Sequence, residues 1–425
     1  MVSSEVRSGV LSSWVEGADG SGFPAEHLPF GVFSTGGGKP RVGVRIGGRV
    51  LDLARLASDG LVGLGPPAGG VFGAGTLNPF LALGPDAWEA VRNRVTELLC
   101  DPAAEARVAP ALVPLADATL RLPIAVADYV DFYSSIEHAT NLGRMFRPDA
   151  EPLLPNWRHL PVAYHGRAGT VVVSGTPVTR PAGQRRLPDG SVTFGPSTRL
   201  DIELELGFVV GVPSRQGHPV AVGEAADHVF GVVLVNDWSA RDIQVWEAQP
   251  LGPFLGKSFA TTMSAWVTPL AALAGSRVDG PAQDPEPLDY LRLDEPWGLD
   301  VDLEVGLVPS GGATHGPPVT ISRGTAAGLY WRMPQQVAHL TANGAHLRTG
   351  DLLASGTISG AERGSEGSLI ELTHNATEPL EIGGVRRAFL EDGDEVVLRG
   401  RARPAEGVTL ELGDAAGRIV PAPSH

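Results

Sequence analysis

The chain has 425 residues, of which 43% are hydrophobic, so it is long enough for two or three domains with sizeable cores. Its formal net charge of −15, without a basic cluster, argues against a nucleic-acid partner or an anionic membrane surface and suits a bound cation. A single cysteine, Cys100, excludes an intrachain disulfide and favours a reducing compartment, so we expect a cytoplasmic protein. The sequence shows neither a secretory signal nor an apolar run of about 18 residues, so we expect no membrane partner.

The first part of the chain predicts a small β domain. Alternating residues at 41–46 and 49–53 flank Gly47-Gly48, a pattern typical of a hairpin. Pro85 opens a predicted helix whose apolar residues recur every three or four positions: Trp88, Val91, Val95 and Leu98. Residues 103–122 are rich in Ala and Pro and indicate a connector. We therefore expect domains at 1–120 and 121–425, the first a small β-barrel for packing or regulation.

The stretch from Asp128 to Arg147 concentrates residue types that carry chemistry. Asp131 offers a hard oxygen ligand, His138 a base with an ordinary pKa near neutrality, and Arg147 a fixed fork for a carboxylate. A lone histidine is more often structural than catalytic, so the interpretation depends on partners elsewhere.

The following loop, residues 154–167, is polar and aromatic and contains Tyr164, His165 and Arg167. Two interpretations are open for these three side chains. They line a pocket, or they hydrogen-bond the backbone of their own loop.

Residues 199–211 alternate strictly and predict a strand with Asp201, Glu203 and Glu205 on one face. One interpretation is an edge strand with a solvated acidic face. The other is that Glu203 and Glu205 chelate one cation, which would relieve their repulsion. The strand alone favours the solvated face.

A buried-type strand follows at 228–235 and leads to Asp237, at a strand end where ligands are common. Ser239 and Asp242 have the spacing of a capping box, which predicts a helical turn beginning there. The same side of this turn would carry Arg241 and Gln244.

The last part of the chain offers further polar groups. Lys257 is a lone charge in an apolar loop rich in Gly and Pro, which is unusual unless the lysine is paired or functional. Pro334 and Gly344 delimit a predicted helix. Thr357 lies in a glycine-spaced loop that lacks the phosphate-binding pattern, and Glu371 lies in a predicted strand at 368–372.

Together these motifs resemble the fumarylacetoacetase family, in its order and near its spacing, from about Trp14 to Pro421. The segment at 28–34 resembles the N-terminal domain of the family's full-length members. The motifs that carry the resemblance are Asp128-Tyr-Val-Asp-Phe-Tyr-Ser-Ser with His-Ala-Thr-Asn, Leu154-Pro-Asn-Trp with Tyr-His-Gly-Arg, Asp201-Ile-Glu-Leu-Glu-Leu, Asn236-Asp-Trp-Ser-Ala-Arg-Asp-Ile-Gln, Pro250-Leu-Gly-Pro-Phe-Leu-Gly-Lys-Ser-Phe and Gly350-Asp-Leu-Leu-Ala-Ser-Gly-Thr-Ile-Ser-Gly.

The resemblance implies a mainly β (α+β) fold, with an N-terminal SH3-like small barrel followed by a larger mixed β-sandwich roll, usually as a homodimer. It implies a divalent cation, Mg²⁺ or Ca²⁺, on Asp131, Glu203, Glu205 and Asp237, and a second ion near Asp237, Lys257 and Thr261. It makes His138 the general base, oriented by Glu371, and assigns stabilisation of negative charge to Arg241, Gln244 and Lys257. Substrate would be held by Tyr133, Arg147, Tyr164, Gln244 and Thr357. Ala248 stands where vertebrate members have a substrate-contacting tyrosine.

The implied reaction is metal-dependent hydrolysis of the carbon–carbon bond of fumarylacetoacetate, a β-diketo acid, to fumarate and acetoacetate in tyrosine and phenylalanine degradation. Water activated by His138 would attack the carbonyl while the cation stabilises the acetoacetate enolate. The alternatives are a related β-diketone or acylpyruvate hydrolase, and a 2-keto acid decarboxylase or isomerase on the same metal site. A metal-stabilised binding protein is a third possibility.

Overall fold

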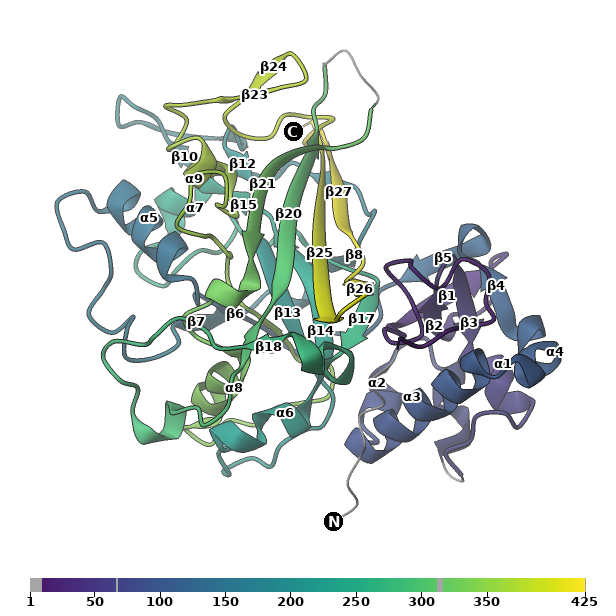
Figure 1. The fold of residues 1–425 in the computed structure, drawn as a ribbon. Helices are drawn as coiled ribbons and strands as arrows, with labels where there is room; N and C mark the ends of the chain where they lie inside the picture. Colours follow the sequence, from purple (N-terminus) through teal and green to yellow (C-terminus); the bar gives the residue numbers. More distant parts are fainter. Residues whose placement is uncertain (1–9, 66–67, 312–315, 425) are drawn as a thin grey trace.

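The computed structural model describes residues 10–65, 68–311 and 316–424 and shows two β-rich parts side by side (Figure 1). The smaller part comprises the N-terminal hairpin and the helices that follow it. Its elements are β1 (Phe30–Thr35), β2 (Arg41–Ile46), β3 (Arg49–Asp52), α1 (Leu53–Ser58), α2 (Asn78–Leu81), α3 (Pro85–Cys100), α4 (Glu105–Val108), β4 (Leu112–Pro114) and β5 (Ala118–Arg121). The hairpin and the helix beginning at Pro85 are confirmed.

The predicted connector at 103–122 is wrong, because this segment belongs to the N-terminal sheet. β4 pairs with β3, and β5 pairs with β1 along the register Val32↔Arg121 to Thr35↔Ala118. The short strands escaped the sequence pattern because Ala and Pro occupy the turns between them, and the partly exposed strands carry few large apolar residues.

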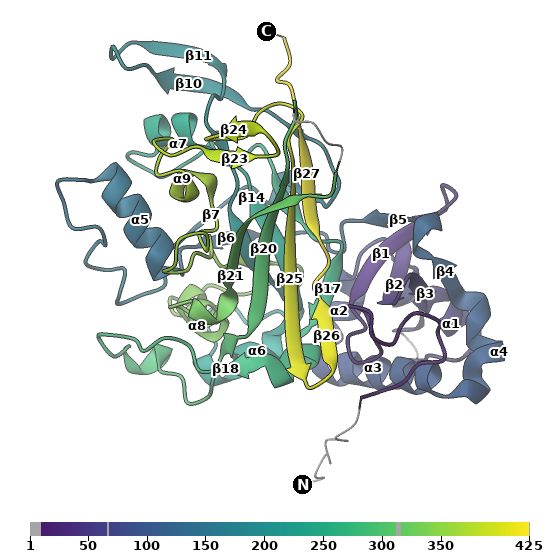
Figure 2. The same cartoon turned by 45° about the horizontal axis from the view of Figure 1, so that its top comes forward.

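The larger part is a sandwich of two sheets packed face to face (Figure 2). The first sheet contains β6 (Tyr129–Phe132), β7 (Ala163–His165), β8 (Val171–Val173), β13 (Leu204–Val210), β14 (Val229–Asp237), β16 (Thr261–Met263), β17 (Trp266–Pro269) and β22 (Leu352–Ala354). The second contains β9 (Val178–Thr179), β20 (Val301–Val308), β21 (Val319–Thr325), β25 (Glu395–Ala405), β26 (Val408–Glu411) and β27 (Ala415–Val420).

Short strand pairs and helices surround the sandwich. The pairs are β10 (Ala182–Arg186) with β11 (Val192–Pro196), β12 (Leu200–Asp201) with β15 (Ser239–Ala240), β18 (Arg277–Val278) with β19 (Gly298–Leu299), and β23 (Leu380–Ile382) with β24 (Val385–Arg387). The helices are α5 (Ile136–Phe146), α6 (Ala225–His228), α7 (Arg241–Glu247), α8 (Met333–Thr341) and α9 (Leu369–Leu372). Every helix among the described residues is too short or too polar to span a lipid bilayer.

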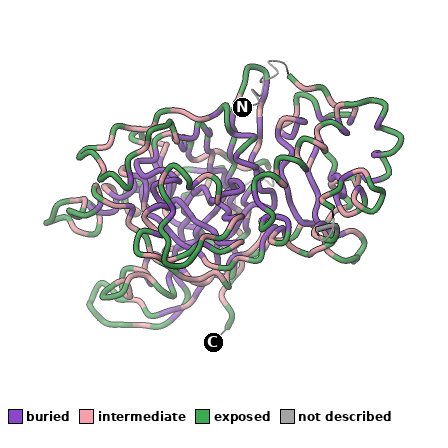
Figure 3. The backbone as a smooth tube through the Cα atoms, turned by 90° about the horizontal axis from the view of Figure 1, so that it is seen from below, coloured by how far each residue is buried: buried purple, intermediate pink, exposed green. Residues whose placement is uncertain are grey.

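The alternation of β13 explains how the site is placed. Leu204, Leu206 and Phe208 enter the core between the two sheets, together with Val305 and Leu398 of the second sheet. Successive strand residues point to opposite faces, so Glu205 projects from the other face of the same strand. In Figure 3 the purple stretches of the chain, which mark buried residues, gather in the interior, where this core lies.

One sheet runs through both parts of the molecule. Its order is β4-β3-β2-β1-β17-β14-β13-β22-β6-β7, and β1 pairs antiparallel with β17 through Phe30↔Val267 and Gly31↔Trp266. A Cβ at Gly31 would lie 2.7 Å from the Trp266 ring, so only glycine permits this close approach. The N-terminal strands therefore extend the first sheet of the larger part. The mainly β α+β class is as predicted. The boundary at 120/121 stays a prediction.

Candidate active site

A cavity of about 250 Å³ lies in the larger part of the molecule. The elements that line it include α5, α7, β6 and β7, which lie on the side of the sandwich away from the N-terminal part (Figure 1). Side chains from β6, α5, β7, α7 and several loops, among them those with Glu203, Lys257 and Thr357, converge on it. The predicted site residues that line it are Asp131, Tyr133, His138, Arg147, Tyr164, Glu203, Gln244, Lys257 and Thr357. Segments far apart in the sequence thus form one site.

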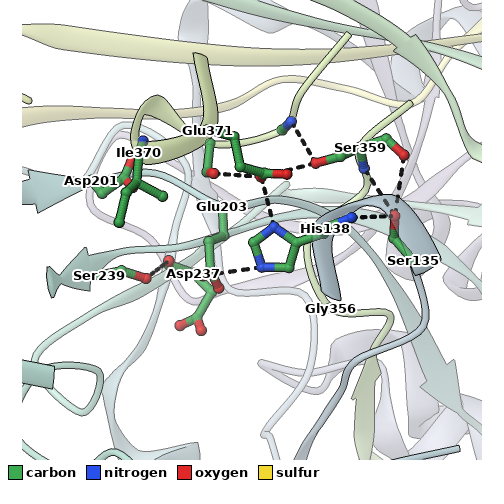
Figure 4. Close-up of polar contacts among 12 residues, drawn as sticks. Ser135, His138, Asp201, Glu203, Asp237, Ser239, Gly356, Ser359, Ile370 and Glu371 are labelled. Carbon is green, nitrogen blue, oxygen red and sulfur yellow. Dashed lines mark hydrogen bonds and ion pairs between the residues drawn. The ribbon is translucent and has the colours of Figure 1, made fainter. Parts of the chain in front are cut away.

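His138 and Glu371 form a buried pair at this cavity (Figure 4). His138 lies in the first turn of α5, where Ser135 caps the helix by accepting from the His138 amide. Its Nδ1 lies 2.6 Å from Oε2 of Glu371, and its Nε2 lies 4.0 Å from Oε1 of Glu203. The ring therefore stands between two carboxylates, one on each nitrogen.

Glu371 is held by several donors. Ser359 Oγ and Ser368 Oγ donate to its Oε2 at 3.0 and 2.6 Å, and Asn141 Nδ2 donates to its Oε1 at 3.0 Å. Burial alone would raise the pKa of Glu371, but His138, Ser368 and Asn141 lower it below its ordinary value. Glu371 is therefore an ionised acceptor that keeps the proton of the imidazole on Nδ1.

The predicted strand around Glu371 is wrong: residues 369–372 form the short helix α9. Asp201 fixes the start of this helix by accepting from the amides of Leu369 and Ile370 at 2.7 and 3.1 Å. Four apolar and acidic residues cannot distinguish a strand from one helical turn, and the deciding carboxylate lies 168 residues away in the sequence.

Three buried carboxylates, Asp131, Glu205 and Asp237, each offer an oxygen within 4.8 Å of the others. Gly356 N donates to Oε2 of Glu205 at 3.1 Å, while Oε1 of Glu205 is buried without a hydrogen-bond partner. Gly356 must be glycine here, with φ of +76° and a Cβ position 2.1 Å from the Phe132 carbonyl.

These carboxyl groups carry the electrostatic signature of a cation site. Burial raises the pKa of Glu205 well above its ordinary value, and Asp131 and Asp237 raise it further. Burial also raises the pKa of Asp131 to about 6, against the lowering effect of Arg167. Oxygen ligands in close groups are what Mg²⁺ and Ca²⁺ prefer, and the unpartnered oxygen of Glu205 leaves a lone pair for such an ion. The residues present therefore fit a divalent cation.

Glu203, the fourth predicted ligand, is held by two cations. Its Oε1 accepts from Arg241 Nη1 at 2.7 Å, and its Oε2 accepts from Lys257 Nζ. Although burial alone would raise the pKa of Glu203, Lys257 and Arg241 hold it well below its ordinary value. All three acidic groups of the 201–205 segment are buried, so the solvated acidic face is wrong. The segment is also not one strand, because β12 ends at Asp201 and β13 begins at Leu204.

Lys257 and Arg241 are themselves buried among carboxylates. Lys257 Nζ also donates to Asp237 Oδ2 at 2.6 Å, and Thr261 Oγ1 donates to Asp237 Oδ1 at 3.2 Å, so the other two residues of the predicted second ion site both contact Asp237. Burial would lower the pKa of Lys257, but Asp237 and Glu203 raise it. Arg241 lies behind Glu203, with Nε on Asp201 at 2.8 Å and Nη1 on Gln244 Oε1 at 3.2 Å.

Helix α7 begins at Arg241 and not at the predicted capping box. Its N-cap is Ala240 without a side-chain cap. Ser239 Oγ donates to the Asp237 carbonyl, and Asp242 accepts from Ser197 and Thr198. The spacing of serine and acid matched a cap, but neighbouring segments compete for both side chains. By contrast, the helix α8 at Pro334 is confirmed.

Both halves of the chain match the same family. Residues 26–123 match the model described as Fumarylacetoacetase N-terminal, and residues 129–420 match the one described as Fumarylacetoacetate (FAA) hydrolase C-terminal. The chain belongs to the fumarylacetoacetase family.

Curated fumarylacetoacetases resemble the chain over nearly its whole length. It is 47% identical over 422 residues to the fumarylacetoacetase of Rattus norvegicus and equally to that of Homo sapiens, covering 96% of this chain and 99% of each relative. It is 44% identical over 423 residues to the protein of the same name from Arabidopsis thaliana, covering 97% and 99%.

Solved structures support the fold. A fumarylacetoacetate hydrolase from Exiguobacterium antarcticum has a TM-score of 0.52 at 16% identity and covers 93% of this chain and 99% of that one. A putative HpcE protein from Mycobacterium smegmatis has a TM-score of 0.50 at 22% identity and covers 92% and 99%. At these identities the likeness concerns the fold of the fumarylacetoacetase family only.

Two residues of this family member's site did not emerge from its sequence as site residues. Asp201 was predicted only as part of an acidic face, yet it holds both Arg241 and the start of α9. Arg167 was one of three loop residues with two open interpretations. Its guanidinium donates to Asp131, one of the three clustered carboxylates. Of the other two loop residues, Tyr164 lines the cavity, while His165 turns outward and contacts Asp128.

Proposed function

We propose that this chain hydrolyses the carbon–carbon bond of fumarylacetoacetate to fumarate and acetoacetate, the last step of tyrosine and phenylalanine breakdown. The observation that carries the proposal is the buried His138–Glu371 pair beside a cavity whose wall includes Asp131, one of three clustered carboxylates that fit a cation. The curated relatives that match the whole chain are named fumarylacetoacetase, which supports this substrate.

The cation, Mg²⁺ or Ca²⁺, would be held by Asp131, Glu205 and Asp237, with Glu203 as the fourth ligand. When bound, it supplies Lewis-acid chemistry, polarising a carbonyl and stabilising the enolate that leaves. A second ion near Asp237, Lys257 and Thr261 also stays a proposal.

His138 is the proposed general base. Nδ1–H of His138 donates a hydrogen bond to the Glu371 carboxylate, so Nε2 is left as the nitrogen that takes a proton from water. Burial of both side chains keeps bulk water away from the pair. This arrangement supports hydrolysis over the decarboxylase or isomerase alternative, since those reactions need no activated water.

Lys257 and Gln244 are the proposed donors to the negative charge that develops on substrate oxygen. Both line the cavity, and because Gln244 Oε1 accepts from Arg241, its amide nitrogen remains to donate. Arg241 lies behind Glu203 and Gln244 and holds both in place, so its predicted contact with the oxyanion stays a proposal.

The remaining lining residues would hold the diketo acid. Arg147 Nε and Thr357 Oγ1 are buried without hydrogen-bond partners, so each has a donor free for a substrate oxygen. The Tyr133 ring packs edge-on against the His138 ring, with ring centres 5.4 Å apart, and Tyr164 also lines the cavity. Ala248, at the end of α7, removes one hydroxyl that vertebrate relatives offer, and we propose that this changes substrate affinity and not the reaction type.

The decisive experiment follows the loss of diketone absorbance with purified protein and fumarylacetoacetate, after chelation and after adding back Mg²⁺ or Ca²⁺. We expect turnover that is lost with the chelator and restored by the cation. An acylpyruvate assayed in parallel tests the related hydrolase, and absence of metal-dependent turnover of fumarylacetoacetate would reject the proposal.

We also propose a cytoplasmic homodimer. Exposed apolar side chains gather on α7 and the loop after it, namely Val245, Trp246, Leu251, Phe254 and Leu255. Leu251 is 96% exposed, which is unfavourable for a monomer in water. Equilibrium sedimentation of the wild type and Leu251→Asp tests this, and a monomeric wild type at micromolar concentration would exclude the dimer.

A further inference from the structure

An unusual backbone turn directs the side chain of Arg167 toward the cluster of carboxylates formed by Asp131, Glu205 and Asp237. Arg167 follows Gly166, and its own φ is +54°, a conformation that residues other than glycine rarely adopt. The Gly166 amide donates to the Tyr129 carbonyl, and Thr170 donates to the Arg167 carbonyl through both its amide and its hydroxyl. These bonds fix the turn that directs the side chain inward, where only 4% of it is exposed.

The guanidinium bridges two of the three clustered carboxylates. Nη2 donates to Oδ2 of Asp131 at 2.7 Å and to Oδ2 of Asp237 at 2.5 Å. The rings of Tyr129 and Tyr164 lie 4.8 and 5.0 Å from the guanidinium carbon. Burial alone would lower the pKa of Arg167, but Asp237, Tyr129 and Asp131 raise it, so the charge is permanent.

We propose that Arg167 is an internal counter-ion that competes with the divalent cation for Asp131 and Asp237 and thereby sets the metal affinity of the site. The inference rests on the metal site of the proposed function. A cation bound to these oxygens would be repelled by a guanidinium at hydrogen-bond distance from the same atoms. Binding therefore requires Arg167 to withdraw from at least one of the two carboxylates.

The charges around the site indicate that a bound dication competes with Arg167 for the carboxylates while Arg167 stays nearby, and does not displace it from the site altogether. The buried carboxylates Asp131, Asp201, Glu203, Glu205 and Asp237 face three buried cations, Arg167, Arg241 and Lys257. With every group ionised the cluster carries −2, the charge that one dication cancels while Arg167 remains nearby. The two tyrosine rings give the withdrawn guanidinium a face on which to rest, because a cation is attracted to an aromatic ring.

The test is a calorimetric titration of chelated wild-type protein and Arg167→Met with Mg²⁺ and with Ca²⁺, alongside thermal melts. Methionine keeps an unbranched apolar side chain in place of the aliphatic part of the arginine and removes the charge. We expect the metal Kd to fall at least about tenfold in the variant. We also expect its Tm to lie below that of wild type without metal, and the difference to shrink at saturating metal, because the cation then replaces the lost charge.

Arg147→Met is the matched control. It removes an equal charge from the cavity lining, where Arg147 donates to the Pro152 carbonyl and not to the clustered carboxylates. Its metal Kd should change much less. Arg167→Gln covers the case in which the methionine variant does not fold, since it keeps a hydrogen-bond donor but removes the charge, and it should also bind metal more tightly than wild type.

An unchanged or higher Kd in the Arg167 variants, or a Tm deficit that persists at saturating metal, would overturn the inference and make Arg167 a positioning residue for the bound state. In that case the wild type still binds metal and the proposed function stands. Wild-type protein that binds neither ion would instead reject both the metal site and this inference.

Discussion

Nδ1 of His138 lies 2.6 Å from Oε2 of Glu371, and the two residues come from helices 233 positions apart. We expect His138→Ala to lower kcat by roughly 10²–10⁴-fold, the usual contribution of a general base. The metal Kd should be unchanged, because the proposed ligands in the cluster are Asp131, Glu205 and Asp237 and not His138. Steady-state kinetics and calorimetry check this, and a large loss of metal affinity would contradict the assignment.

Glu371→Gln should lower kcat while leaving KM nearly unchanged. The amide keeps the shape of the side chain but loses the charge that fixes the proton on Nδ1. Ser359, Ser368 and Asn141 would still hold the side chain in place. A variant with wild-type kcat at every pH would show that the pair is structural only.

Glu205→Gln should weaken metal binding by about tenfold or more, because it removes the buried carboxylate whose Oε1 has no partner. The same change should stabilise the chelated protein, since one buried negative charge among three is removed. Calorimetry and thermal melts in chelator measure both effects. An unaltered Kd would remove Glu205 from the ligand set.

Asp201→Asn should reduce the free energy of unfolding by about 3–5 kcal/mol, the usual cost of removing one partner of a buried ion pair. It leaves Arg241 with less compensation and weakens the anchor of α9, so kcat should also fall as Glu371 shifts. Urea unfolding and kinetics measure these losses. Asp302→Asn is the control, because its pair with Arg403 is exposed and should contribute at most about 1 kcal/mol.

His27 should make the protein sensitive to acid. Its Nε2 lies 2.9 Å from Thr268 Oγ1 of β17, and burial, aided by Arg92 and Arg45, lowers its pKa from 6.5 to about 3. The unfolded chain therefore binds a proton below pH 6.5 that the folded chain takes up only near pH 3. The stability contribution is complete above pH 6.5 and is lost progressively as the pH falls toward 3.

We expect His27→Gln to flatten the dependence of the unfolding free energy on pH below 6.5 by up to about 1.4 kcal/mol per pH unit. Urea titrations at several pH values measure the slope. The exposed His218, changed to Gln, should leave it as in wild type. Equal slopes for His27→Gln and wild type would show that this histidine is not the source of acid sensitivity.

Much of the fold follows from local sequence patterns. The hairpin around Gly47-Gly48, the helices that begin near Pro85 and Pro334 and the strand that ends at Asp237 were predictable, because periodicity and turn residues act within a few positions. Three short segments whose secondary structure was predicted wrongly share one cause. The segments at 112–121, 239–242 and 369–372 take their structure from partners that are distant in the sequence.

The site was predictable in its residue types and not in its contacts. The resemblance to the family placed His138 with Glu371, and the structure brings them to hydrogen-bond distance. The position of Arg167 between Asp131 and Asp237 depends on a positive φ after Gly166, which no periodic pattern signals. The two cations on Glu203 likewise become visible only when the loop with Lys257 and the helix with Arg241 are folded together.

The pairing of β1 with β17 means that the N-terminal part covers the edge of the sheet that carries the candidate site residues. A chain shortened to begin at residue 121 would leave β17 with unpaired backbone groups beside Trp266 and Val267, which are buried in the intact molecule. Exposed strand edges of this kind pair with other chains. The first third of the sequence therefore acts as a built-in guard against aggregation, and shortening it would cost solubility before it cost catalysis.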